Sequence, residues 1–186
     1  VHLPEATSTT HLRAAAADYG VIAKTMMEAI VERCERDADY PFIDTKLDLI
    51  TGRDFAPDDP IRGRSAIYGW IQGRGLEAVA SHGGWWERRG ESRDLVDRMR
   101  AVAADVLAQL RRMRANNEGR LSFFMTPSGE PFRLDDAERP VTFAVAEDAP
   151  YGFSDLFCAK GMFAAAQWLG DKAASAEALA YIHAVD

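Results

Sequence analysis

The sequence has only two cysteines, Cys34 and Cys158, and four histidines among its 186 residues. Two cysteines far apart in the chain cannot supply a disulfide framework, and their spacing matches no zinc motif. Free thiols are typical of a reducing compartment, so we expect a cytoplasmic protein. The sequence also lacks a Gly-rich phosphate-binding loop. We therefore expect neither a metal ion nor another cofactor.

The chain is also poor in long hydrophobic runs and in positive charge. No apolar run reaches the roughly 20 residues that a membrane-spanning helix needs, and no charged-then-apolar signal segment opens the sequence. The 22 basic residues are outnumbered by 29 acidic ones, which gives a net charge of −7. An acidic surface repels nucleic acids and anionic membranes, so we expect neither as a partner.

What remains is an ordinary globular composition, with 47% hydrophobic and 27% charged residues. This is enough apolar material for a core and argues against disorder. A chain of this length suits one domain, and we assign residues 1–186 to it.

Hydrophobic spacing predicts five helices, over residues 11–37, 65–82, 92–116, 154–169 and a last one beginning at 173 or 175. The second and fourth are apolar nearly all round, which is typical of buried helices; the others are apolar on one side. In the first helix the core-facing stripe is expected to hold Tyr19, Ile22, Ala23, Met26, Ile30 and Cys34. Alternating inner and outer helices favour an all-α toroid.

The connections between these helices contain turn residues. Residues 46–55 alternate well enough for a hairpin about Thr51 and Gly52, and a strand over 121–125 is expected to pair with 132–134. Gly83 and Gly84 are expected to end the second helix, and Ser92 and Ser154 to cap the third and fourth.

Arg74 lies in the middle of the apolar face of the second helix, between Trp70 and Ala78. A buried charge is costly unless an ion-pair partner or a ligand meets it, and the pattern leaves both open. Three glycines in the same helix each cost roughly 1 kcal/mol relative to alanine. They indicate close approach by another backbone or by a ligand, and they are Gly69, Gly73 and Gly75.

Residues 70–74, WIQGR, resemble the W-[LIV]-Q-G-R motif of the N-acylglucosamine 2-epimerase family, which includes the renin-binding proteins. Residues 153–157, followed by Gly161 and Met162, are similar to the family's F-S-E-x-F-Y-x-x-A-M block. Here Asp155 replaces the usual Glu and Cys158 the usual aromatic residue. The likeness covers most of the chain from about Phe42 to Gly170.

The resemblance implies an (α/α)6 barrel of about twelve helices, of which this chain would hold the first five. We expect a partial α/α barrel with its short hairpins at one end, over the starts of the inner helices. Such a partial barrel leaves apolar surface uncovered. We therefore expect the natural chain to continue beyond Asp186 or to associate, with a homodimer as one form.

The resemblance further implies a sugar 2-epimerase or aldose–ketose isomerase that removes and returns a proton at C2 of an open-chain sugar. It assigns to Arg74 the stabilisation of negative charge on the carbonyl oxygen. Trp70 and Gln72 would line or support the pocket, and Ser154 and Asp155 would bind substrate.

The family uses two histidines as base and acid, and they lie on later helices. None of the four histidines here matches them by motif; they are His2, His11, His82 and His183. We therefore expect the isolated chain to be inactive.

Two alternatives stay open. A glycoside hydrolase on a related barrel needs two carboxylates, and Asp155 with Asp48 or Asp54 is a candidate pair that no spacing singles out. The other is a non-catalytic helical interaction module. The cost of a buried Arg74 argues against this module.

Two arginines precede the second helix. Arg62 and Arg64 could bind an anionic substrate group, although solvated loop charges are the more common use of such residues.

Overall fold

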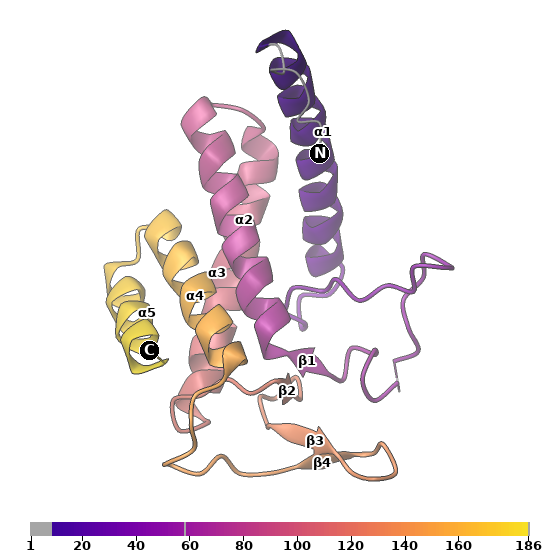
Figure 1. Cartoon of the computed structure of the whole chain (residues 1–186), viewed down its shortest axis with the longest axis vertical. Coiled ribbons are helices and arrows are strands. Elements are labelled where there is room, and N and C mark those ends of the chain that lie inside the picture. Colours follow the sequence, from indigo (N-terminus) through magenta and orange to yellow (C-terminus); the bar gives the residue numbers. More distant parts are fainter. Residues whose placement is uncertain (1–8, 58, 186) are drawn as a thin grey trace, which may run out of the picture.

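The computed structural model describes residues 9–57 and 59–185, and this part of the chain is mostly helical (Figure 1). His2 lies outside the described residues. The helices are α1 (Thr9–Glu35), α2 (Gly69–Arg89), α3 (Arg93–Ala115), α4 (Phe153–Leu169) and α5 (Lys172–Val185). The expected all-α class is confirmed, whereas the expected partial α/α barrel stays a prediction.

Four short strands form two antiparallel pairs at one end of the helices. They are β1 (Ile67–Tyr68), β2 (Phe124–Met125), β3 (Phe132–Leu134) and β4 (Pro140–Thr142). β1 pairs with β2 and β3 with β4, so the expected pairing of 132–134 with 121–125 is reduced to one bridge between Met125 and Pro131. The strands lie where α2 and α4 begin (Figure 1), which is the expected end.

The core is built around direct contact between α2 and α4. A Cβ atom added at Gly73 would overlap the backbone of Phe157 and Cys158, and one at Gly161 would overlap the carbonyl of Gly73. Only glycine allows two helix backbones to come this close. The prediction that the α2 glycines mark close approach of another backbone is confirmed for Gly73 and for Gly69, where a Cβ would overlap the carbonyl oxygen of Ser122. At Gly75 the close neighbour is the Ile43 side chain.

The expectation that Gly83 and Gly84 end this helix is wrong. α2 continues to Arg89 and ends at Gly90, whose φ is 67°. Gly83 is needed for packing, since a Cβ at this position would collide with the ring of Trp168 on α4, and a Cβ at Gly84 would lie 3.3 Å from the same ring.

One of the two expected serine caps is in place and the other is wrong. Ser92 is the N-cap residue of α3, where its carbonyl accepts from the Val96 N–H at 2.9 Å, although its side chain makes no capping hydrogen bond. Ser154 is not the cap of α4. Gly152 occupies the N-cap position of α4, and its N–H donates to the carboxylate of Asp155 at 2.7 Å. The residues 46–55 form a turn closed by the Asp48 N–H and the Arg53 carbonyl, 2.9 Å apart, with no strand on either side.

The expected core stripe of α1 is only partly right. Its members Ala23, Ile30 and Cys34 pack partly buried against the core, but the side chains of Tyr19, Ile22 and Met26 are exposed by 72%, 53% and 57%. The buried residues of α1 include Met27 and Val31, which the expected stripe omitted. α1 extends past the other helices at its N-terminal end (Figure 1), so the body of the protein covers mainly its C-terminal part. Within residues 9–57 and 59–185, no helix combines the length and the apolarity needed to cross a bilayer.

The α2–α4 contact predicts a large cost for adding one methyl group. Gly73→Ala should lower the free energy of unfolding by about 1–3 kcal/mol or more, because overpacking forces the helices apart. Gly20→Ala on α1 is the matched control, since nothing lies within 4 Å of its added Cβ and alanine favours a helix. Urea denaturation measures both, and equal stability of Gly73→Ala and the parent would contradict the contact.

Candidate functional site

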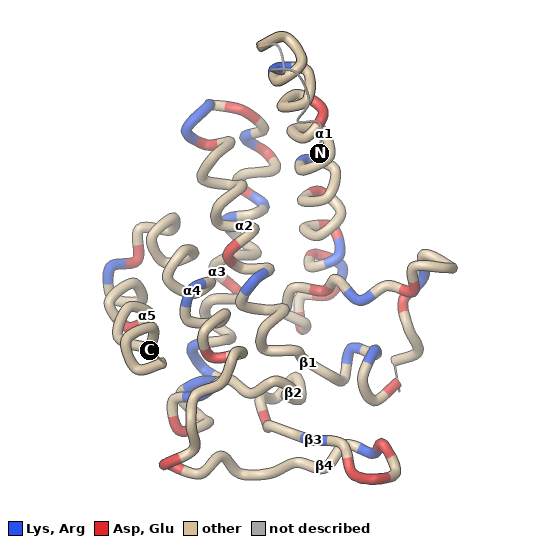
Figure 2. The backbone as a smooth tube through the Cα atoms, in the orientation of Figure 1, with Lys and Arg blue, Asp and Glu red and all other residues tan. Residues whose placement is uncertain are grey.

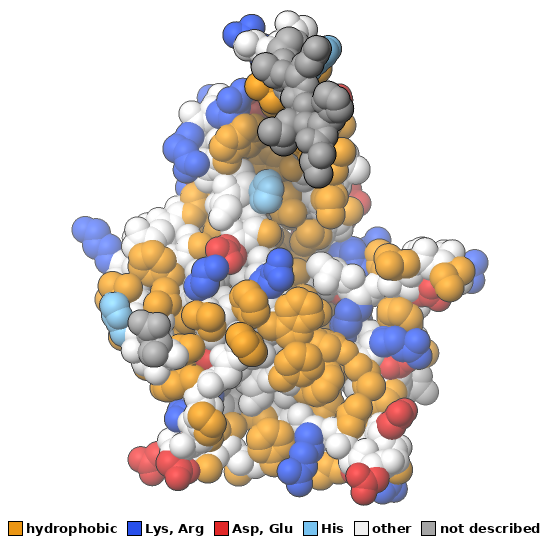
Figure 3. Space-filling view, viewed as in Figure 1, with side chains coloured by type: hydrophobic (Ala, Val, Ile, Leu, Met, Phe, Trp, Pro, Cys, Tyr) orange, Lys and Arg blue, Asp and Glu red, His pale blue; other side chains and the backbone are white. Residues whose placement is uncertain are grey.

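A cavity of about 550 Å³ lies at the strand end of the molecule, beside the start of α4. Its walls are largely apolar, and the rings of Phe124 and Phe132 are stacked with centroids 5.2 Å apart. Hydrophobic side chains gather on the surface at this end (Figure 3), where Phe123 is 52% and Phe153 81% exposed. The cavity thus lies at the end where the short hairpins were expected, over the starts of the inner helices.

Asp155 lines this cavity and is buried, and its carboxylate holds three segments together. One oxygen accepts hydrogen bonds from the Leu121 N–H, at 2.8 Å, and from the Tyr181 hydroxyl; the other accepts from Gly152. Burial and the neighbouring carboxylate raise the pKa of Tyr181, so the phenol stays a donor. The acceptors of Asp155 are thus engaged within the protein, which makes it a positioning group for the start of α4.

Ser154 also lines the cavity, and its hydroxyl is buried without a hydrogen-bond partner among the described residues. The indole N–H of Trp70 is in the same state. The starts of α2 and α4 touch here, because a Cβ at Gly69 would lie 3.3 Å from the Ser154 Cβ. Buried polar groups are normally hydrogen-bonded, so two such groups at the adjoining helix starts make this end the best candidate for a polar ligand.

Arg74 is exposed, and the expectation that it is buried is wrong. Its guanidinium carbon lies 5.5 Å from the centroid of the Phe157 ring on α4, and no carboxylate within the described part of the chain pairs with it. The reason is that α2 is covered by α4 only on its glycine side. Because Arg74 is not buried, the cost of burying its charge no longer argues against an interaction module.

Gln72 is buried and clamps the loop before β1. Its side-chain oxygen accepts from the Ile43 N–H at 2.7 Å, and its amide nitrogen donates to the Ile43 carbonyl at 3.0 Å. Both the oxygen and the nitrogen of the amide are hydrogen-bonded, so Gln72 supports the loop. The cavity described above is not lined by Trp70, Gln72 or Arg74.

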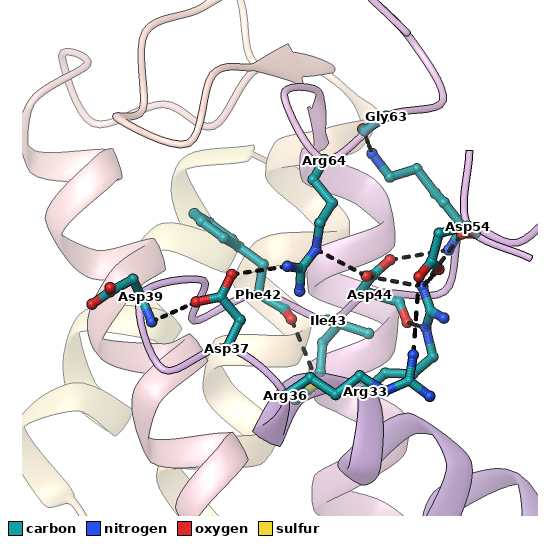
Figure 4. Close-up of polar contacts among 12 residues, drawn as sticks. Arg33, Arg36, Asp37, Asp39, Phe42, Ile43, Asp44, Asp54, Gly63 and Arg64 are labelled. Atoms are coloured by element: carbon teal, nitrogen blue, oxygen red, sulfur yellow. Dashed lines mark hydrogen bonds and ion pairs between the residues drawn. The ribbon is translucent and has the colours of Figure 1, made fainter. Parts of the chain in front are cut away.

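Sequence reasoning missed a buried ion-pair cluster that holds this same loop (Figure 4). The carboxylate of Asp44, 4% exposed, bridges Arg33 at 2.9 Å and Arg64 at 3.3 Å. Arg64 also pairs with Asp37 at 2.9 Å, and Arg33 with Asp54 at 2.7 Å. Arg64 is thus paired with two carboxylates and is no free anion ligand, although its side chain is still 37% exposed. No periodic pattern links residues so distant in sequence.

Lys46 lies beside this cluster and closes the loop onto the start of α2. Its ammonium donates to the carbonyls of Gly63 and Ala66, the latter at 2.6 Å. Burial lowers the pKa of Lys46 from 10.5 to about 8, although Asp44 and Asp59 nearby favour the charged form. Arg62, for its part, pairs with Asp59 at 2.7 Å.

The alternative catalytic groups do not gather around the cavity. Asp54 pairs with Arg33 and lines a separate depression, while Asp48 accepts from the Ile50 N–H of its own turn at 2.8 Å. His82 is hydrogen-bonded to the Ala78 carbonyl at 2.8 Å. Across residues 9–57 and 59–185, no three His, Cys, Asp or Glu side chains are grouped to hold a metal ion.

Comparison with family models, with curated proteins and with solved structures finds no match to this chain.

The Gln72 clamp predicts a loss of stability when the amide is removed. Gln72→Leu should lower the free energy of unfolding by about 1–3 kcal/mol, because it leaves the buried N–H and carbonyl of Ile43 without partners. Gln167→Leu, at an exposed position of α4, is the control. If both variants unfold at the parent's denaturant midpoint, the clamp is not formed.

The lowered pKa of Lys46 predicts a distinctive pH dependence. Between pH 8 and 10.5 the unfolded chain binds more protons at this lysine than the folded one, so its contribution to stability rises with pH. Lys46→Met removes this contribution. The stability of the parent relative to the variant should therefore increase across that window, as measured by urea titrations at each pH. A constant difference would contradict the burial of the ammonium.

Proposed function

We propose that this chain carries the arginine side of a sugar-binding site of the N-acylglucosamine 2-epimerase kind. The reaction class is 2-epimerisation or aldose–ketose isomerisation. The substrate is an open-chain sugar, and the acid–base pair is not contributed by the described histidines. The role of the described residues is then binding and charge stabilisation.

One observation carries this proposal. The two segments that resemble the family, residues 70–74 and 153–157, are far apart in sequence but lie in direct backbone contact at Gly73 and Phe157. Their contact sets the Arg74 guanidinium beside the Phe157 ring, close to the helix starts with the unpaired Trp70 and Ser154 groups. A cation, an aromatic face and two unused polar groups suit a polyhydroxylated ligand with a carbonyl oxygen.

The chemistry follows from the charge that develops in the reaction. Removal of the C2 proton moves negative charge onto the carbonyl oxygen, and a fixed cation stabilises that charge most when water is excluded. Arg74 is exposed in this chain, so its contribution here is to binding. Rate enhancement would require a further segment or partner to cover this face.

The glycoside hydrolase alternative loses support, because Asp155 is engaged by three donors and Asp54 lies in a separate depression. The interaction module keeps one observation in its favour, the exposed apolar side of α1. A measurement of sugar binding distinguishes the sugar-binding site from the interaction module, because only the former predicts that a sugar binds near Arg74.

Arg74→Met should weaken the binding of an N-acetylated hexosamine by about 10- to 100-fold, the loss expected for one charge-assisted hydrogen bond. Arg93→Met, at another exposed arginine, should bind like the parent. Both variants should unfold like the parent, since neither side chain is buried. Saturation-transfer NMR measures binding, and equal binding by all three proteins would contradict the role of Arg74.

The same sample in D₂O tests catalysis. We expect no exchange of the C2 proton, because none of the described histidines lines the cavity and His82 is hydrogen-bonded to the Ala78 carbonyl of its own helix. Exchange catalysed by this chain and lost in His82→Gln would contradict that expectation.

A further inference from the structure

The helix α1 has two apolar sides, and only one of them is used. Met27 and Val31 are buried against the rest of the protein, and Cys34 is partly buried with them. The other side carries large side chains that are more than half exposed: Leu12 at 58%, with Tyr19, Ile22 and Met26. A surface helix normally presents polar residues to water, so this second side needs its own explanation.

The exposed side follows a seven-residue repeat. Leu12, Tyr19 and Met26 recur every seven residues, and Ala15, Ile22 and Ala29 recur every seven residues between them. At about 100° per residue these six positions form one stripe, roughly 120° away from the side that packs on the body. We call this stripe the α1 seam. Such a repeat is the spacing by which one helix packs along another.

We propose that the α1 seam is an interface at which two copies of this chain pair their α1 helices antiparallel. Consider a two-fold antiparallel pair whose axis passes between Tyr19 and Ile22. Two residues from the two copies then face each other when their numbers sum to about 41, as those of Tyr19 and Ile22 do. Leu12 then faces Ala29 of the second copy, Met26 faces Ala15, and Tyr19 faces Ile22. Large side chains meet small ones in two of the three layers, so the seam is complementary to itself, as a two-fold interface requires.

Charge also permits this pairing. The whole chain carries −7, but the segment from Thr9 to Ala29 holds two cations and two anions, which alternate along it: Arg13, Asp18, Lys24 and Glu28 (Figure 2). Because these charges are balanced, the seams of two copies do not repel each other electrostatically. The seam is roughly 25 Å long at 1.5 Å per residue, so the interface is small and we expect a dissociation constant on the order of micromolar.

This inference does not depend on sugar binding. Sedimentation velocity of the 186-residue chain, from about 1 to 200 µM, should give a monomer–dimer equilibrium. Tyr19→Lys should raise the dissociation constant by at least about tenfold. Val21→Lys is the matched control: Val21 is 67% exposed but lies roughly 130° round the helix from the seam, so its variant should dimerise like the parent.

Cross-linking tests the orientation. In a Cys34→Ser background, an oxidised mixture of Ala15→Cys and Met26→Cys chains should form a mixed disulfide dimer. Neither variant should form one alone, because equal positions lie far apart in an antiparallel pair. A monomer at all concentrations would overturn the proposal and leave the seam to a different partner. A disulfide from Ala15→Cys alone would overturn the antiparallel arrangement.

Discussion

The backbone contact between α2 and α4 is the constraint on which the rest of the structure depends. Gly73 and Gly161 remove the side chains that would hold these helices apart. Their approach fixes the thiol of Cys158 against the Gly69 carbonyl at 3.1 Å and brings the two helix starts together. Everything assigned to the candidate site, from Ser154 to Arg74, is placed by this contact.

Around this pair, charged and amide side chains hold irregular backbone in place. Gln72 and the Asp44 cluster hold the loop before β1, and Asp155 holds the segment before β2 and the last helix. Each of these groups satisfies buried donors or acceptors that the loops cannot satisfy themselves. Gln72 and Asp155, two of the residues that looked like ligand contacts in the sequence, thus act first on the protein's own backbone.

The positions of the helices and the close packing at the α2 glycines could be predicted from the sequence. Both follow from local properties, namely the spacing of hydrophobic residues and the cost of a glycine to helix stability. The exposure of Arg74 could not, because an apolar helix face predicts burial only if another element covers it. The same reason explains Tyr19 and Met26, which fit a core stripe by spacing but face solvent. The Arg33–Asp44–Arg64 cluster joins three segments, and pairing over such separations leaves no periodic signal. The resemblance to sugar epimerases rests on residues 70–74 and 153–157, and it stays a proposal.

The central claim is that contact between α2 and α4 creates a sugar-binding surface with Arg74 at its centre. Chemical-shift mapping of the isotopically labelled chain with an N-acetylated hexosamine tests it most directly. The account predicts saturable shifts confined to Trp70, Arg74, Ser154, Phe157 and their neighbours at the starts of α2 and α4. Absence of saturable shifts, or shifts centred on another part of the chain, would contradict it.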